Sequence, residues 1–135
     1  MMNKIRMVVC VTCLVIAACN GTNVRLKASS LERAIDEYSA AWRWTLYSKI
    51  AAMHQDKDGG QLNLDTERLK AVRVTGYRVA EKIINEAVTE ATVKGEIEYY
   101  VTSQGTLQKV SFEHIWWYDE SRKAWFNAGQ IPPFK

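Results

Sequence analysis

Two ionisable side chains could do chemistry in an apolar setting, and the first is His114. It falls in an alternating run that puts it on one face with four other residues: Val110, Phe112, Trp116 and Tyr118. An imidazole has a pKa near neutrality, so an inward His114 could act as a general base. The alternative is a histidine that packs in a core or contacts a ligand. Its neighbour Glu113 points to the opposite face, so no carboxylate is predicted to orient the ring.

Lys49 is the second candidate, because it falls in the middle of an apolar helical stripe when residues are placed 100° apart. An inward Lys49 could hold an anionic ligand near His114, whereas a snorkelling lysine would only pack its stem on the core. His54 lies at the end of the same predicted helix, where an interaction with the helix dipole explains it. The predicted pocket is lined by five residues: His114, Lys49, Phe112, Trp116 and Tyr99.

Several site classes are absent from the sequence. It has no Gly-rich phosphate loop, His-Glu-x-x-His helix, nucleophile elbow or complete calcium loop. The three Cys and two His do not have the spacing of a metal cluster or of a disulfide framework. We therefore predict no metal and no cofactor.

The first twenty residues have the layout of an export signal. Lys4 and Arg6 precede an apolar stretch over 7–18, which is shorter than the roughly 20 residues of a membrane-spanning helix. The sequence Ile16-Ala17-Ala18-Cys19 resembles the bacterial lipobox. This resemblance implies removal of residues 1–18 and lipidation of Cys19, and the alternative is a non-lipidated signal cut after Ala18.

Cleavage before Cys19 would change the net charge of the chain, and lipidation of Cys19 would attach the protein to a membrane. It would leave 16 basic and 15 acidic residues, so no basic surface remains for nucleic acid or anionic lipid. We expect the membrane to be reached through the lipid on Cys19. In lipoproteins of diderm bacteria Asp after the lipidated Cys favours the inner membrane, and here Asn20 follows. The periplasmic face of the outer membrane is therefore expected over the inner membrane.

The helical part of the chain follows a polar tether over 19–29. Ser29 and Glu32 form a capping-box pattern, and apolar residues then recur every three or four positions as far as Met53. The Asp- and Gly-rich stretch 56–60 is predicted to stop this long helix. A short second helix is predicted from Asp65 or Thr66 to about Val72.

The rest of the chain has the patterns of β-strands. Residues 93–101 alternate between apolar and polar, 107–118 and 123–129 are rich in β-branched and aromatic residues, and turn sequences separate the three runs. Residues 77–89 are predicted as a strand, with a helix as the alternative. The predicted fold is a single α+β domain over 30–135, in which a long N-terminal helix and a short helix pack on a curved antiparallel sheet of three to four strands.

This order of elements resembles the cone-shaped nuclear transport factor 2-like (cystatin-like) superfamily over residues 30–130. The resemblance includes the closing aromatic pattern Trp116-Trp117-Tyr118-Asp119, a turn, and Trp125-Phe126. It implies a pocket between the long helix and the sheet. In members that are isomerases or dehydratases, an Asp or His inside the cone acts as the base, and a second polar group stabilises the oxyanion.

A second apolar face on the long helix includes Trp44 and Tyr47, roughly opposite the main stripe. One helix cannot bury both faces against one sheet, so either the second helix or a partner must cover this face. The partner could be a second copy of the chain or another envelope protein.

These observations predict a non-catalytic, lipid-anchored cell-envelope protein that binds a small apolar ligand or a partner protein. The alternatives are an isomerase or dehydratase that uses His114 as base, and an assembly subunit that uses the Trp44 and Tyr47 face. A carboxylate within hydrogen-bond reach of His114 would favour the enzyme. An exposed Trp44 beside a filled cone would favour the assembly subunit.

Overall fold

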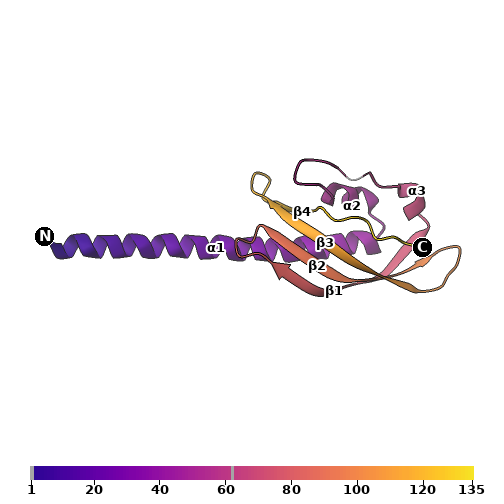
Figure 1. The fold of residues 1–135 in the computed structure, drawn as a ribbon, viewed down its shortest axis with the longest axis horizontal. Helices are drawn as coiled ribbons and strands as arrows, with labels where there is room; N and C mark the ends of the chain where they lie inside the picture. The colour runs from indigo at the N-terminus through magenta and orange to yellow at the C-terminus, as the bar shows by residue number, and fades with distance from the viewer. Residues whose placement is uncertain (1, 62) are drawn as a thin grey trace.

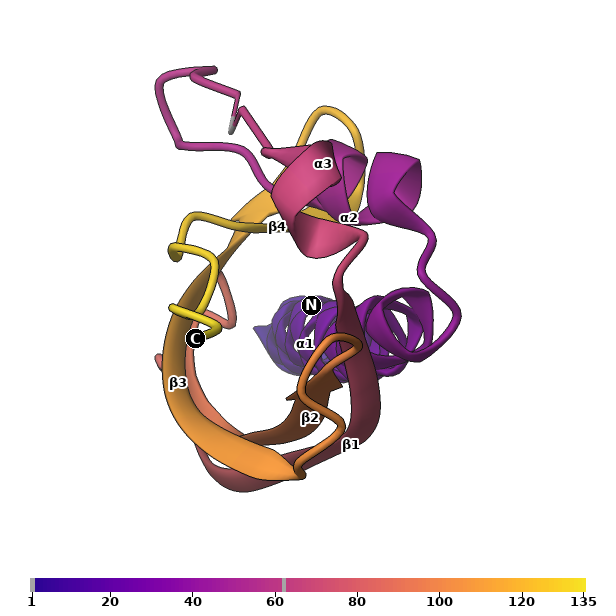
Figure 2. The same ribbon diagram turned by 90° about the vertical axis from the view of Figure 1, so that its right-hand side faces the viewer.

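The chain folds as a helix cradled by a curved sheet (Figures 1 and 2). The computed structural model describes residues 2–61 and 63–135, with side chains from residue 21 onward apart from 62. The elements are α1 (Met2–Arg43), α2 (Tyr47–Met53), α3 (Thr66–Leu69), β1 (Val72–Ile84), β2 (Glu90–Val101), β3 (Gln108–Asp119) and β4 (Ala124–Asn127). The antiparallel sheet has the order β1-β2-β3-β4. The predicted α+β architecture is confirmed.

The main apolar stripe of α1 faces the concave side of the sheet. Leu31, Ile35, Tyr38 and Trp42 are spaced by three or four residues, so they share one side of the helix, and all four are buried. They belong to one hydrophobic core with side chains of the sheet, including Val93, Ile97 and Trp116. Figure 2 shows β1, β2 and β3 curving around α1, with α2 and α3 on the open side. The predicted stripe is therefore confirmed as far as Trp42.

The predicted continuous helix to Met53 is wrong, because α1 ends at Arg43. Thr45 has a φ of 56°, and the Leu46 N–H donates to the Ala41 carbonyl over 2.9 Å, which is the bond of a Schellman ending. Gly usually occupies the left-handed position of this motif, so a Thr there carries no stop signal in the sequence. The break separates α2 from α1 and lets Ile50 reach the core.

The predicted helix start at Ser29 is also wrong, because residues 20–29 are helical within α1. Ser29 Oγ donates to the Leu26 carbonyl over 3.2 Å, and Ser30 Oγ donates to the Lys27 carbonyl over 2.7 Å. Serine hydroxyls that bond back to the preceding turn are compatible with a helix interior. The capping box with Glu32 is therefore not formed, and the segment is not an irregular tether.

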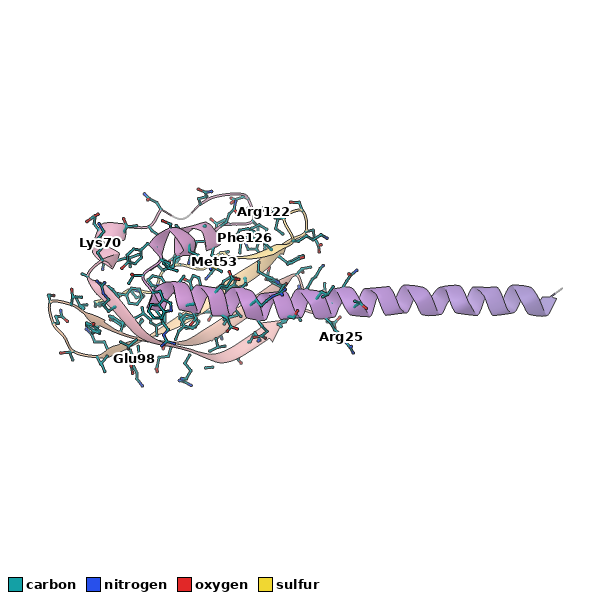
Figure 3. All side chains as sticks on the ribbon, turned by 180° about the vertical axis from the view of Figure 1, so that it is seen from behind. Arg25, Met53, Lys70, Glu98, Arg122 and Phe126 are labelled. Atoms are coloured by element: carbon teal, nitrogen blue, oxygen red, sulfur yellow. The ribbon has the colours of Figure 1, made fainter. Side chains whose placement is uncertain are left out.

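Docking of α1 on the sheet begins near Lys27. Its side chain pairs with Glu120 and lies 5.0 Å from the centre of the Tyr118 ring, and its carbonyl accepts from Trp125 Nε1 over 3.1 Å. Residues 21–26 are exposed, and Figure 3 shows Arg25 on the part of α1 beyond the sheet. The domain is thus held on α1 from Lys27 onward.

The uncertain segment 77–89 is a strand over most of its length. β1 continues to Ile84, and residues 85–89 form the turn to β2. Asn85 Oδ1 accepts from the backbone N–H groups of Thr89 and Glu90, which closes this turn. The strand prediction is therefore confirmed to Ile84, and the helix alternative is wrong.

The short second helix starts where predicted and ends earlier. Asp65 caps α3, because its side chain accepts from the Arg68 N–H over 3.1 Å. The helix ends at Leu69 rather than at Val72, which is the first residue of β1. A β-branched run directly after Ala71 favours the strand.

Candidate functional site

The inside of the cone is filled by packed rings. Phe112, His114 and Trp116 are buried, as the alternation predicted, and the Phe112 and His114 rings stack with 4.6 Å between their centroids. Tyr38 of α1 meets His114 and Trp116 edge-on at centroid distances of 5.4 and 5.5 Å. Four pockets lined by described residues do not include His114. The side chains expected to line a pocket here, Phe112, His114 and Trp116, pack against one another and against Tyr38.

The other two predicted pocket residues lie elsewhere. Tyr99 is buried, but it packs against Phe134 of the C-terminal segment, with 4.8 Å between the ring centroids. Lys49 is exposed, and its Nζ lies 3.3 Å from a carboxylate oxygen of Glu37. The inward placement of Lys49 is therefore wrong. The break at Thr45 is the reason, because the 100° spacing that put Lys49 on the stripe holds only within one helix.

His114 sits in an environment that keeps its ring neutral. Desolvation, with a smaller contribution from the nearby His54, lowers the pKa of His114 to about 3. The backbone of Gln130 acts in the opposite direction and raises the pKa, and Nε2 has no hydrogen-bond partner among the described residues. Its Nδ1 lies 3.5 Å from Tyr77 Oη. Among the described residues no carboxylate bonds to the ring, so His114 is a weak base without an acidic partner.

His54, which the sequence analysis explained by the helix dipole alone, is buried, as is Asn127. It is 1% exposed, Nδ1 lies 3.1 Å from the Gly129 carbonyl oxygen and Nε2 lies 2.7 Å from Tyr38 Oη. A carbonyl only accepts, so Nδ1 carries the hydrogen and Nε2 accepts from the Tyr38 hydroxyl. Desolvation lowers the pKa of His54 to about 4. The available signal was its position four residues after Ile50, which places both on one helical face.

The two aromatic residues of the second helical face have different surroundings. Tyr47 is partly buried, and its hydroxyl donates to the Leu69 carbonyl over 2.8 Å, so α3 covers it. Trp44 lies in the turn between α1 and α2 and is 73% exposed, and Leu46 beside it is 48% exposed. The short helix α3 therefore covers Tyr47, whereas Trp44 stays exposed to solvent.

This turn lies at the end of the domain remote from the N-terminus. Figure 1 shows the C-terminal end of α1 and the turn between β2 and β3 at that end, whereas the N-terminal part of α1 leaves the domain at the other. Leu107, in the turn between β2 and β3, is also exposed. We call the exposed pair Trp44 and Leu46 the Trp44 turn. It is the most exposed aromatic feature among the described side chains.

Two kinds of structural feature are absent from the described residues. No helix there is both long enough and apolar enough to cross a bilayer. No group of three or more His, Cys, Asp or Glu in that part of the chain is placed to hold a metal ion. Cys19, the predicted lipidation site, lies outside the residues whose side chains are described.

Comparisons with known proteins add little to this geometry. No protein-family model matches the chain, and no curated protein sequence matches it. Among solved structures, it is similar to a Pseudomonas putida protein provisionally assigned as a polyketide cyclase, with a TM-score of 0.40 and 11% identity. The match covers 73% of this chain and 90% of that chain. A likeness of this strength carries no argument about function.

Proposed function

We propose that this protein is a lipid-anchored, non-catalytic assembly subunit of the cell envelope, which binds a partner protein through the Trp44 turn. The observation that carries the proposal is the 73% exposure of Trp44 beside a cone filled by side chains. Trp is enriched at interface hot spots, and the exposed Leu46 beside Trp44 enlarges the apolar surface that a partner could cover. The filled cone supports a role that needs no substrate cavity.

The position of the Trp44 turn favours a different protein over a second copy as partner. In the proposal, the lipid on Cys19 holds the N-terminal end of α1 at the membrane, and the Trp44 turn is at the other end of the domain (Figure 1). Two copies anchored in one membrane would both direct this turn away from it. An isologous pair of such copies would have to meet side by side at this end of the domain, whereas a different protein can cover the turn directly. The partner therefore approaches from the side opposite the membrane.

The other two hypotheses have weaker support. An apolar ligand inside the cone would have to displace rings that are already packed, such as Phe112 and Trp116. An isomerase or dehydratase would need a base stronger than a buried imidazole with a pKa of about 3. The described residues offer no carboxylate bonded to His114 that would raise that value.

Site-specific photocrosslinking in intact cells tests the proposal. A photoreactive phenylalanine analogue replaces Trp44 in one strain and Ile83, an exposed residue of β1, in a second. We expect one discrete heterologous adduct from position 44 and none of that mass from position 83. The same adducts from both positions, or no adduct from position 44, would overturn the proposal. An adduct between two copies would replace the heterologous partner with a homo-oligomer.

A binding measurement with the partner identified in this way completes the test. Trp44→Ala should weaken binding by about 30-fold, the loss typical of a central interface Trp, and Trp44→Phe should restore part of it. Ile83→Ala is the matched control, since it also removes an exposed apolar side chain. Equal affinities for wild type and Trp44→Ala would show that the adduct formed by proximity alone.

A further inference from the structure

An open groove of about 420 Å³ lies between α1, the end of α2 and β4, which is an edge strand of the sheet. Two of its lining residues, Ala34 on α1 and Ala124 on β4, have small side chains, which leave room between the helix and the strand. Ser30 Oγ accepts from Trp125 Nε1 over 3.0 Å, so a hydrogen bond joins α1 to β4 beside the groove. The volume is within the range of small-molecule sites.

The groove contains two cations without an anionic partner. They are Arg33 on α1 and Lys123, which directly precedes β4. Both residues are exposed, and neither side chain forms an ion pair or a hydrogen bond with another described residue. Their charged groups are therefore accessible to a ligand from solvent.

The carboxylates around the groove are already paired with other cations. One of them, Glu37, lines the groove, and two more lie in the turn between β3 and β4. The three pairs are Glu37 with Lys49, Asp119 with Arg122 and Glu120 with Lys27. Since these pairs offset one another, Arg33 and Lys123 give the groove an excess of positive charge, which attracts an anion.

Lys123 has a backbone conformation that suits glycine better than lysine. Its φ is 53°, in the left-handed region where a Cβ is unfavourable. A cationic side chain at this position is therefore present at a conformational cost, and residues held in this way are often functional. This favours a role for the ammonium group at the groove.

The surface next to the two cations is apolar. Met53 at the end of α2 and Phe126 in β4 are partly buried lining residues, and both are labelled in Figure 3. Together with Ala34 and Ala124 they can cover a hydrocarbon group, which gains free energy when it leaves water. A ligand that matches the groove therefore has both a negative charge and an apolar part.

We propose that this groove binds a small organic anion, whose carboxylate or phosphate group lies at Arg33 and Lys123 and whose apolar part packs on Met53 and Phe126. A guanidinium group donates paired hydrogen bonds to either kind of acid group, and an ammonium group adds a second positive charge. The site is independent of the protein interface proposed above, because it shares no residue with the Trp44 turn.

Titration of the full-length, isotope-labelled chain in a neutral detergent, followed by NMR, tests this inference. The probes are benzoate and phenyl phosphate, with benzamide as the neutral analogue and acetate and inorganic phosphate as anions without an apolar part. We expect benzoate, phenyl phosphate or both to give saturable shifts of the Ala34 and Ala124 backbone amides, and the more tightly bound probe identifies the preferred acid group.

The neutral analogue should give no saturable shift, and the anions without a ring should bind at least tenfold more weakly because they bury no apolar surface. Equal affinity for benzamide, equal affinity for acetate or inorganic phosphate, or no saturable shift from any probe would overturn the proposal.

Three variants locate the binding. Arg33→Gln and Lys123→Gly should each weaken the preferred probe by about fivefold, the upper end for an exposed ion pair. Arg43→Gln is the matched control, since it removes an exposed cation of α1 outside the groove, and it should leave the affinity unchanged. Lys123→Gly should unfold at no lower a urea concentration than the wild type, because Gly fits the left-handed φ, so its weaker binding cannot come from unfolding. Wild-type affinity in both Arg33→Gln and Lys123→Gly would contradict the proposal.

Discussion

Trp42 and Trp44 are two residues apart at the end of α1, yet Trp42 is 2% exposed and Trp44 is 73% exposed. Trp42 packs against Phe134 with 5.4 Å between ring centroids and meets Tyr38 edge-on. The same residue type therefore has two roles here. One indole stabilises the fold, and the other remains available to a partner.

Trp42→Ala and Trp44→Ala should consequently differ strongly in their effect on stability. We expect Trp42→Ala to lower the free energy of unfolding by about 3 to 5 kcal/mol, the range for emptying a buried aromatic site. Trp44→Ala should change it by less than about 0.5 kcal/mol, as surface substitutions do. Urea denaturation of both variants beside the wild type measures the difference. A loss under about 1 kcal/mol for Trp42→Ala would show that its site is not part of the core.

The two buried histidines make stability dependent on pH. The pKa of His54 is lowered to about 4 and that of His114 to about 3, from 6.5, in both cases mainly by desolvation. Below pH 6.5 the unfolded chain therefore binds more protons than the folded chain. The free energy of unfolding should fall by about 1.4 kcal/mol per pH unit for each histidine as the pH drops from 6.5 toward these values, and should be insensitive to them above about pH 7.5.

Urea denaturation at a series of pH values measures this slope, and His54→Gln should remove about half of it. NMR titration of the ring protons gives an independent reading of the same groups. Titration of both rings near pH 6.5 with no loss of stability would contradict the prediction.

At the residue scale, the alternation of apolar and polar residues was sufficient to predict which side chains of β3 are buried. It did not predict which hydrogen bonds the buried polar side chains make. The period of two placed Phe112, His114 and Trp116 on the inner face of β3, and the structure confirms this. His54 was assigned to a helix end because its partners, Tyr38 and Gly129, are distant in sequence. No local pattern encodes a contact between a helix and a C-terminal segment 75 residues away.

Among the elements, the break between α1 and α2 was the feature least visible in the sequence. Thr45 has a φ of 56°, in the left-handed region where a β-branched residue is strained. A continuous apolar periodicity through this position favoured one helix. The tertiary gain from burying Ile50 outweighs the local preference.

Thr45→Gly should therefore stabilise the domain by about 1 kcal/mol, because Gly adopts the left-handed conformation without a Cβ clash. Ala52→Gly in α2 is the matched control and should destabilise by about 1 kcal/mol, since that residue is helical and exposed. Thermal and urea denaturation compare the two variants. If both destabilised equally, the turn would not hold Thr45 in a strained conformation.

The neighbouring strands approach closely at Gly95 in β2. A Cβ built at Gly95 would lie 2.0 Å from the Arg78 carbonyl oxygen and 2.7 Å from the Phe112 ring. Gly76 in β1 has more room, because a Cβ there would meet only Glu98 Cβ, at 3.4 Å. We expect Gly95→Ala to destabilise by about 3 kcal/mol or more, as overpacking does, and Gly76→Ala to be tolerated. Equal unfolding midpoints for the two variants would contradict this account.

At the scale of the whole molecule, our proposal assigns the two ends of the domain to different tasks. The N-terminal part of α1 projects from one end, and the Trp44 turn lies at the other (Figure 1). Arg122 stacks on the Phe126 ring at 3.9 Å beside the turn between β3 and β4 (Figure 3). Helical residues between Cys19 and Lys27 would hold the docked domain about 12 Å from a lipid on Cys19. In the proposal, this helical segment would set both the distance and the orientation of the Trp44 turn relative to the membrane.

The anchor itself is tested by Cys19→Ala. With residues 1–18 removed, the chain has 16 basic and 15 acidic residues, so its surface supplies no strong attraction to anionic lipids, and acyl chains on Cys19 would be the main contribution to membrane binding. Cys19→Ala should therefore move the protein from the membrane fraction to the wash, whereas Cys13→Ala, a change within the predicted signal, should leave it membrane-bound. Fractionation with a high-salt wash separates these outcomes, and the intact mass of the wild-type protein should show residues 1–18 missing and acyl chains added. Retention of Cys19→Ala after the wash would mean that another part of the chain contacts the membrane.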